Sequence, residues 1–493
     1  RTPDGTRFRM LETLREYGAE RLAEQGLITA GRTAHARWFA TLVRAQDERL
    51  RGPQQLDALR VLDTERDDVL AALRFLGDDG DAVGAVDLAV HLGWYWLLRE
   101  SGQDATRWTS FALAVPGAHE APGGVMAEAL QTVLGFAIGT ETADIREAQQ
   151  ELVTLAGRLE FDRHPGAKVL RPLLLFMGEQ REAANAALQR VLGDPDPWVR
   201  AAGRLAQLAY AENDGDVDLM RRYGDDAVVE WERLGDRWGL AAMLTSRGQV
   251  RTLDGDLAGA KADFERAREC IRQLGGNSSD DVMVTMRLAE LRLRDGDAAG
   301  AREYLEVMRA QRTFGAGEPL QQIFIAAIEG GIAVTEKDDA AVARAYEDLR
   351  DLLCTLGTPS LMTAHSGAVG HAIASGLALK LGRLDETEKH VREGYTQAVL
   401  TNDKPIIASV GAAVAAWAQA RGQAREAAVV LGASTRLRGS DDATSPNVIE
   451  LVAALREDLG EEYEVAYAEG QALDSDAATA RVDPEVVQAV AAS

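Results

Sequence analysis

A period of about forty residues is the feature that most constrains the fold of this chain. A glycine or an aspartate beside other polar residues interrupts the apolar pattern at nearly regular positions, which are Gly102, Gly139, Gly178, Gly215, Gly255, Gly296, Asp338, Gly382 and Gly422. The intervals between these turn signals run from 37 to 44 residues. A fixed period of this length is typical of repeat architectures, in which each unit buries its apolar face against its neighbours.

The clearest unit runs from Gly239 to Leu274 and predicts two antiparallel helices. In its second half, apolar residues recur at intervals of three and four positions, namely Leu257, Ala260, Phe264, Ala267, Ile271 and Leu274. Such spacing places them in one stripe along an α-helix. The Asp254-Gly255-Asp256 turn separates this helix from an equally apolar first half, and Gly275 marks its end. The unit is therefore an αα-hairpin.

Small residues recur at a fixed distance from the turn signals. Five residues after five of them stands an alanine: Ala183, Ala260, Ala301, Ala343 and Ala427. We expect an alanine there to let the second helix of a hairpin approach the first closely. Successive units also open alike, with Asp196-Pro197-Trp198 and Asp236-Arg237-Trp238.

The clearest unit resembles the tetratricopeptide (TPR) repeat, on Gly248 in its first helix and Ala260, Phe264 and Ala267 in its second. The resemblance is weaker elsewhere, where Met220 and Thr387 stand at the alanine position, and the period exceeds the usual 34 residues. The prediction is an all-α chain, a right-handed α-solenoid of about nine TPR-like hairpins over residues 81–440.

Composition narrows the functional classes. The 493 residues carry 54 Lys and Arg against 78 Asp and Glu, which gives a net charge of −24. A surface this acidic repels phosphate backbones and anionic lipids, so we expect no direct nucleic-acid binding and no membrane association by this region. Two cysteines, Cys270 and Cys354, form no disulfide framework and favour a reducing, cytoplasmic setting. The uncharged stretch 406–420 is too short to span a bilayer and predicts a buried helix.

The two ends of the chain carry a second resemblance. The segments Phe8–Tyr17, His35–Phe39, Glu65–Leu73, Leu92–Trp96, Ala424–Gly439 and Tyr463–Gly470 are similar to parts of STAND-type bacterial transcription regulators of the SARP and large LuxR-like types. The resemblance implies that residues 1–30 end a winged-helix subdomain. Within them, the alternation at Thr6–Met10 predicts a short strand, and the pattern of Leu11–Glu24 predicts a helix with Leu14, Tyr17 and Leu22 facing inward. Residues 31–80 would be connecting helices, with predicted helices at Ala34–Leu50 and Asp63–Leu76, and residues 441–493 closing helices and a tail.

In such regulators a DNA-binding module and an NTPase precede a helical repeat arm. Because the chain begins at Arg1 rather than at a methionine, we expect it to be part of a longer polypeptide or a processed product. The resemblance implies an upstream NTPase of the same polypeptide as a partner. No lysine here follows a glycine, as a P-loop requires, so that NTPase is not in this chain.

No pattern of catalytic, cofactor-binding or metal-binding residues emerges from the sequence. Gly315-x-Gly317 has Leu320 where a dinucleotide fingerprint needs glycine. Glu386 and His390 share a helix face, but no second pair accompanies them, and we interpret them as a surface contact. The carboxylate clamp of some TPR domains is also not evident, since the corresponding positions hold Ala242, Thr245, Ser246 and Gln249.

One aromatic cluster is a candidate docking or ligand-binding edge. Trp94, Tyr95 and Trp96 are consecutive, and Trp108 follows in the next predicted helix. They could form the packed core of the first hairpin, or an exposed edge that binds the upstream domain or a ligand.

The sequence thus leads to a functional hypothesis. The chain is expected to be a sensor or interaction arm that binds a protein partner or a small effector in its superhelical groove and thereby controls the NTPase and DNA-binding modules. The alternative is a free-standing protein-interaction scaffold with no role in transcription. An enzyme is not expected.

Overall fold

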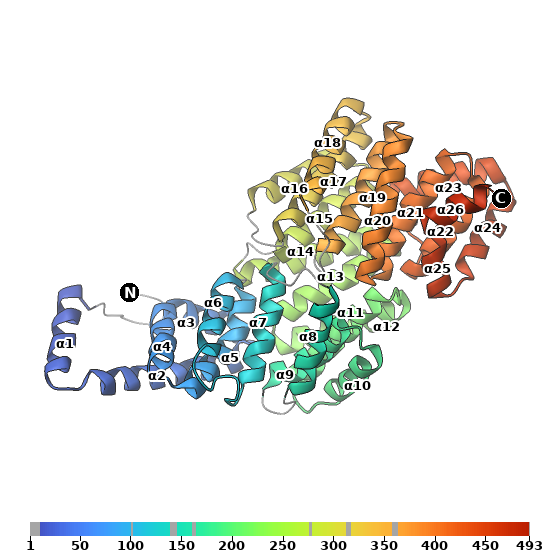
Figure 1. Cartoon of the computed structure of the whole chain (residues 1–493). Helices are drawn as coiled ribbons and strands as arrows, with labels where there is room; N and C mark the ends of the chain where they lie inside the picture. The colour runs from blue at the N-terminus through green and yellow to red at the C-terminus, as the bar shows by residue number, and fades with distance from the viewer. Residues whose placement is uncertain are drawn as a thin grey trace. The chain divides into compact units, whose positions relative to one another are not determined.

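The computed structural model describes residues 10–99, 102–138, 145–159, 164–275, 279–311, 317–356 and 363–492. All regular structure in these residues is helical (Figure 1), so the expected all-α class is confirmed. The chain divides into two compact units, Arg1–Gln131 and Thr132–Ser493. Among the described residues, no helix combines the length and the apolar character needed to cross a membrane.

The first unit contains six helices and the start of a seventh. Their bounds are α1 (Glu12–Glu24), α2 (Ile28–Arg49), α3 (Gln55–Thr64), α4 (Arg66–Asp78), α5 (Ala82–Leu98), α6 (Gly102–Leu113) and α7 (Gly124–Ile138). The helices α2, α4 and α5 pack on one another, and α6 packs on α5. The expected helices at 11–24, 34–50 and 63–76 are found as α1, α2 and α4, while α3 was not predicted. The expected strand falls mostly outside the described residues.

The prediction that Leu14, Tyr17 and Leu22 of α1 face inward is wrong. Leu14 and Tyr17 each keep 57% of their surface exposed, and Leu22 is also exposed. On the next helix, the Trp38 side chain is 69% exposed. The reason is that α1 packs mainly against α2, so most of its apolar face is left uncovered in the described part of the chain.

The second unit begins with a stack of helical pairs. After α8 (Ile145–Arg158), the pairs are α9 (Pro165–Met177) with α10 (Arg181–Leu192), α11 (Pro197–Asn213) with α12 (Val217–Leu234), α13 (Arg237–Leu253) with α14 (Leu257–Leu274), α15 (Ser279–Arg294) with α16 (Ala298–Ala310), α17 (Gly317–Glu336) with α18 (Asp339–Thr355), α19 (Thr363–Lys380) with α20 (Leu384–Thr401), and α21 (Lys404–Ala420) with α22 (Ala424–Arg438). Each pair packs against the next, as in an α-solenoid (Figure 1).

Four short helices complete the second unit. They are α23 (Pro446–Leu459), α24 (Glu462–Gln471), α25 (Ser475–Arg481) and α26 (Pro484–Ala492). They pack on α22 and cover the last hairpin, whose helix α21 contains the uncharged stretch 406–420. Trp417 of α21 is fully buried there, which confirms the expected buried helix.

The repeat signals have a clear structural basis in the clearest unit. Gly248 of α13 lies against the ring of Phe264 of α14, and a Cβ at Gly248 would approach that ring to 2.6 Å. Ala260 and Ala267 are fully buried on the same helix. The TPR-like positions are therefore those where the two helices of the hairpin approach each other most closely.

The expectation that the residue of closest approach stands five positions after each turn signal needs a correction in two units. The turn residue in the left-handed conformation is Glu179 rather than Gly178, and Lys337 rather than Asp338. Counted five residues from these, the buried positions are Ala184 and Val342, whereas Ala183 is exposed and Ala343 half-buried. The position of closest approach is thus set by the left-handed residue of the turn, and a non-glycine residue can take that role.

The repeated aspartates at the start of α11 and α13 are helix caps. The Asp196 carboxylate accepts hydrogen bonds from the backbone amides of Trp198 and Val199. The Asp236 carboxylate accepts equivalent bonds from Trp238 and Gly239. The fully buried Asp236 also accepts a bond of 2.9 Å from the indole of Trp198, which joins one hairpin to the next.

Candidate functional site

Within the second unit, the stack turns back on itself. The Asn213 amide donates to the carbonyl oxygen of Asn402 at 2.9 Å, and the Thr444 hydroxyl donates to that of Thr252 at 3.3 Å. These bonds join residues 189 and 192 positions apart. In a simple solenoid each repeat contacts only its neighbours. Here residues 437–445, which we name the closing segment, instead reach repeats far back along the chain.

Two glycines permit this return. Gly215 forms the turn between α11 and α12, and Gly439 follows the end of α22. Both have positive φ angles, +69° and +80°. A Cβ on Gly215 would overlap the carbonyl oxygen of Leu437, and one on Gly439 would overlap the carbonyl oxygen of Gly215. The two backbones therefore touch directly, and a side chain at either position would force them apart.

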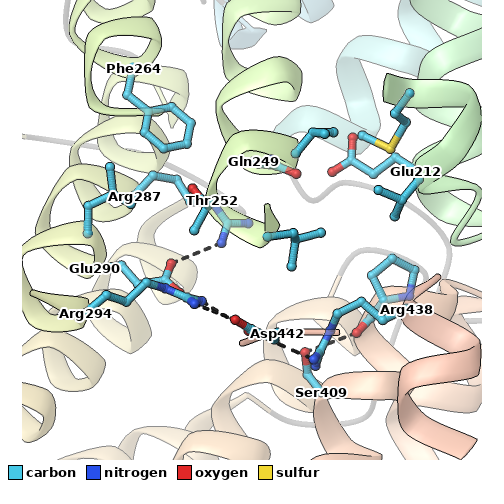
Figure 2. Close-up of a pocket in the computed structure, with 16 residues that line it drawn as sticks. Glu212, Gln249, Thr252, Phe264, Arg287, Glu290, Arg294, Ser409, Arg438 and Asp442 are labelled. Atoms are coloured by element: carbon cyan, nitrogen blue, oxygen red, sulfur yellow. Dashed lines mark hydrogen bonds and ion pairs between the residues drawn. The ribbon is translucent and has the colours of Figure 1, made fainter. Parts of the chain in front are cut away.

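The return encloses a cavity of about 230 Å³, which we name the central cavity (Figure 2). One wall comes from three successive hairpins, mainly from their first helices α11, α13 and α15 with residues of α12 and α14, and the opposite wall from α21, the end of α22 and the closing segment. The lining residues are Glu212, Val217, Met220, Gln249, Val250, Thr252, Leu253, Phe264, Arg287, Glu290, Leu291, Arg294, Pro405, Ser409, Arg438 and Asp442. Its surface combines apolar groups with charges of both signs.

Arg294 connects the two walls. Its guanidinium donates to Asp442 of the closing segment at 2.6 and 3.2 Å and to Glu290 one helical turn away at 2.8 Å. It also donates to the Thr444 hydroxyl at 2.6 Å. Only 9% of the Arg294 side chain and 11% of the Asp442 side chain is exposed. Removing one partner of an ion pair this well buried and hydrogen-bonded strongly destabilises the folded protein, because the remaining charge stays buried without compensation.

Glu290 is held ionised between two arginines. Burial alone would raise the pKa of Glu290, but the charges and hydrogen bonds of Arg294 and Arg287 lower it to about 2. The Glu290 side chain keeps 31% of its surface accessible and lines the cavity. Arg287 donates to Glu290 at 3.2 Å, while its buried Nε has no hydrogen-bond partner among the described residues.

Arg438 and Glu212 are less well compensated. Burial lowers the pKa of Arg438, against the opposing effect of Asp442, whose nearest carboxylate oxygen lies 3.9 Å away. Burial raises the pKa of Glu212, while Arg287 and the Gln249 side chain act in the opposite direction. Burial thus disfavours the charged form of both groups, a guanidinium with few partners and a carboxylate, which line the same cavity. Such a site is suited to recognise a charged group.

The aromatic residues singled out from the sequence lie elsewhere, in the first unit. Tyr95, Trp96 and Trp108 are buried, and Trp94 is half-buried. The Tyr95 hydroxyl donates to Asp63 at 3.0 Å, and Trp108 makes an edge contact with Phe111. Three of the four residues thus belong to the core of this unit. Their role as a docking edge stays a prediction.

One part of the central cavity has a local signal in the sequence. Arg287, Glu290 and Arg294 are three and four residues apart, so they share one face of α15. Gln249, which corresponds to a position of the carboxylate clamp in some TPR domains, also lines the cavity. No local pattern could show that Arg438 and Asp442 join them, because about 150 residues separate these groups from Arg294.

A second buried polar cluster corrects the interpretation of His390 as a surface residue. His390 is only 4% exposed. Its Nε2 lies 3.1 Å from the Tyr346 hydroxyl and its Nδ1 lies 3.0 Å from Nδ1 of His371. Burial lowers the pKa of each histidine to about 4, helped by the charge of His390 on His371 and by that of Lys389 on both. The helices α18, α19 and α20 meet at this cluster, which buries the side chains between them.

Comparison with known proteins adds little beyond the fold. No family model matches the chain, and no curated protein matches it. Among solved structures it is similar to the crystal structure of the APC/C hetero-tetramer Cut9-Hcn1, with 14% sequence identity over 82% of this chain and 94% of that one. The TM-score is 0.30, and no function is transferred from that structure.

Proposed function

We propose that this chain is a recognition arm without catalytic activity of its own, and that a small effector or a short segment of a partner protein binds in the central cavity. The observation that carries this proposal is the cavity itself, built by three successive hairpins and closed by residues 437–445. An occupant would contact both walls at once. It would therefore bias the stack between a closed and an open state, provided that it binds the two states with different affinity.

The proposal extends to the setting of the arm, which rests on the resemblance to STAND-type transcription regulators. In that setting the arm would control an NTPase and a DNA-binding module of the same polypeptide. The exposed apolar side chains of α1 and α2 support this, because large apolar residues such as Leu14, Tyr17 and Trp38 are often covered by another domain when they are exposed together. The upstream domain is the occupant that we propose for this face.

A cavity-blocking variant tests the recognition function. Ser409 is exposed on α21 at the cavity lining, so Ser409→Trp fills the cavity without replacing a core residue. Thr396→Trp on the exposed surface of α20 is the matched control, since Thr396 does not line the cavity. A panel of cellular metabolites is screened by thermal shift against the unmodified chain and both variants.

The proposal predicts compounds that raise the melting temperature of the unmodified chain and of Thr396→Trp, but not of Ser409→Trp. Stabilisation of all three proteins by every active compound would show that the binding site lies elsewhere and would contradict the proposal.

A second experiment tests the setting. The chain is expressed with the coding sequence that precedes Arg1, and hydrogen exchange of α1 and α2 is compared with that of the chain alone. A regulator arm predicts an upstream P-loop NTPase and slower exchange in both helices. An upstream region without a P-loop would favour the free-standing scaffold.

A further inference from the structure

The carboxylate of Asp442 occupies the central cavity in the way that a bound anion would. Asp442 lies outside any helix, on the closing segment, yet its two oxygens accept hydrogen bonds from both terminal nitrogens of Arg294. Two-point pairing of this kind is how arginine recognises carboxylates and phosphates. The chain thus supplies an internal anionic group to its own cavity.

Asp442 does not satisfy all the arginines around it. Among the described residues, the Arg438 guanidinium makes no hydrogen bond, and its one ionic contact is the 3.9 Å approach to Asp442. The buried Nε of Arg287 and that of Arg294 also lack acceptors in the described chain. Buried cationic donors without acceptors are costly, and Arg438 lines the cavity, so its guanidinium has capacity for a further acceptor there.

The charge balance of the cavity points the same way. Three arginines face Glu290, Asp442 and Glu212. Burial raises the pKa of Glu212, so the charged form of the third carboxylate is disfavoured. The acidic exterior, with its net charge of −24, has little effect on this local balance, since water and salt screen charges beyond about 8–10 Å.

We propose that the central cavity binds a small organic anion through a carboxylate or phosphate group held by Arg438 and Arg287, and that this group competes with the Asp442 carboxylate for the arginines. The inference rests on the proposed recognition function and names the ligand class of that site. Displacement of Asp442 would release the closing segment from Arg294. The closing segment could then separate from the earlier hairpins that it contacts.

Binding of two simple probes tests the ligand class. Inorganic phosphate and succinate are titrated calorimetrically into the whole chain and into three variants. Asp442→Asn removes the internal anion and keeps the side-chain shape. The affinity of the chain for the preferred probe should therefore rise by about tenfold. Arg438→Met should lower affinity by about tenfold or more, which is the effect of one charged hydrogen bond. Preference for phosphate or for succinate distinguishes the two sources of the anionic group.

The control for lost charge is Arg302→Met. Arg302 pairs with Glu336 on the surface and does not line the cavity, so this variant should bind the probes like the unmodified chain. Melting curves of every variant establish that it is folded. If Arg438→Met does not fold, Arg287→Met replaces it, since Arg287 has the more accessible side chain.

Hydrogen exchange of residues 437–445 tests the competition itself. Bound phosphate or succinate should accelerate exchange in this segment of the unmodified chain. Equal affinity of the unmodified chain, Asp442→Asn and Arg438→Met, or no binding to any of them, would overturn the proposal. If the metabolite screen then identified a neutral ligand blocked by Ser409→Trp, the recognition function would stand and only the anionic ligand class would fail.

Discussion

The variant Gly215→Ala tests whether the repeat stack closes on itself, and Gly296→Ala is its matched control. Both glycines form hairpin turns in the left-handed region, with φ angles of +69° and +72°. A methyl group in that conformation costs about 1–2 kcal/mol at either position, because the Cβ crowds the adjoining carbonyl oxygen. At Gly296 nothing else lies within 4 Å of the added carbon, whereas at Gly215 it overlaps the Leu437 carbonyl oxygen.

Only Gly215→Ala therefore has to push the closing segment away. The displacement strains or breaks hydrogen bonds near this contact, of which three are Asn213–Asn402, Thr444–Thr252 and Arg221–Ser440. A hydrogen bond contributes a net ~1 kcal/mol, and the third of these is exposed, so the additional loss is about 1–3 kcal/mol. The variant should be less stable than its control by that amount.

Urea unfolding followed by circular dichroism measures this difference, and limited proteolysis reports on the accessibility of residues 437–445. Gly215→Ala should unfold at lower urea and be cleaved in the closing segment, while Gly296→Ala should resist cleavage there. Losses of stability that agree within about 0.5 kcal/mol, with no difference in cleavage, would refute the reasoning.

Three further predictions concern the buried polar groups. Arg294→Met leaves two buried carboxylates without their common partner and should cost about 3–5 kcal/mol of unfolding free energy, which urea unfolding measures. His371 and His390 have pKa values lowered from 6.5 to about 4. Their contribution to stability is therefore complete above pH 6.5 and is lost as the pH falls toward 4. Melting temperatures measured across that pH range should fall less steeply in His390→Gln than in the unmodified chain. Asp236→Ala loses a helix cap and the hydrogen bond from the Trp198 indole, and its unfolding free energy should fall by about 2–4 kcal/mol. Asp196→Ala loses the cap alone and should cost about 1 kcal/mol, and urea unfolding measures both values.

The fold could be predicted from the sequence wherever short-range patterns determine it. The glycine at 255 fixes a turn, and the stripe from Leu257 to Leu274 fixes the helix that follows. The predicted turn position is one residue away from the left-handed residues Glu179 and Lys337. A left-handed residue other than glycine leaves no compositional signal in the sequence. The helix periodicity of Leu14 and Tyr17 was read correctly, but whether another layer covers an apolar face depends on the rest of the structure.

The central cavity could not be predicted for a related reason. The face of α15 that carries Arg287, Glu290 and Arg294 is visible in the sequence as ordinary helical spacing, which also describes an exposed ion-pair ladder. What makes it a site is the arrival of Arg438 and Asp442, and that depends on how much each hairpin is rotated from the previous one. Small rotations summed over several repeats determine which distant segments meet, and no local motif encodes the sum.

The contact between the closing segment and the inner wall can be measured directly by cross-linking. The Thr444 hydroxyl lies 3.3 Å from the Thr252 carbonyl oxygen, so in a variant without Cys270 and Cys354 the substitutions Thr252→Cys and Thr444→Cys place two thiols on residues in contact. The account predicts rapid intramolecular cross-linking by a short bis-maleimide in the native state and a large loss of cross-linking in urea, with neither single-cysteine variant forming the product. Native protein that modifies both thiols without linking them would show that the stack does not return on itself, and the central cavity would no longer be a site.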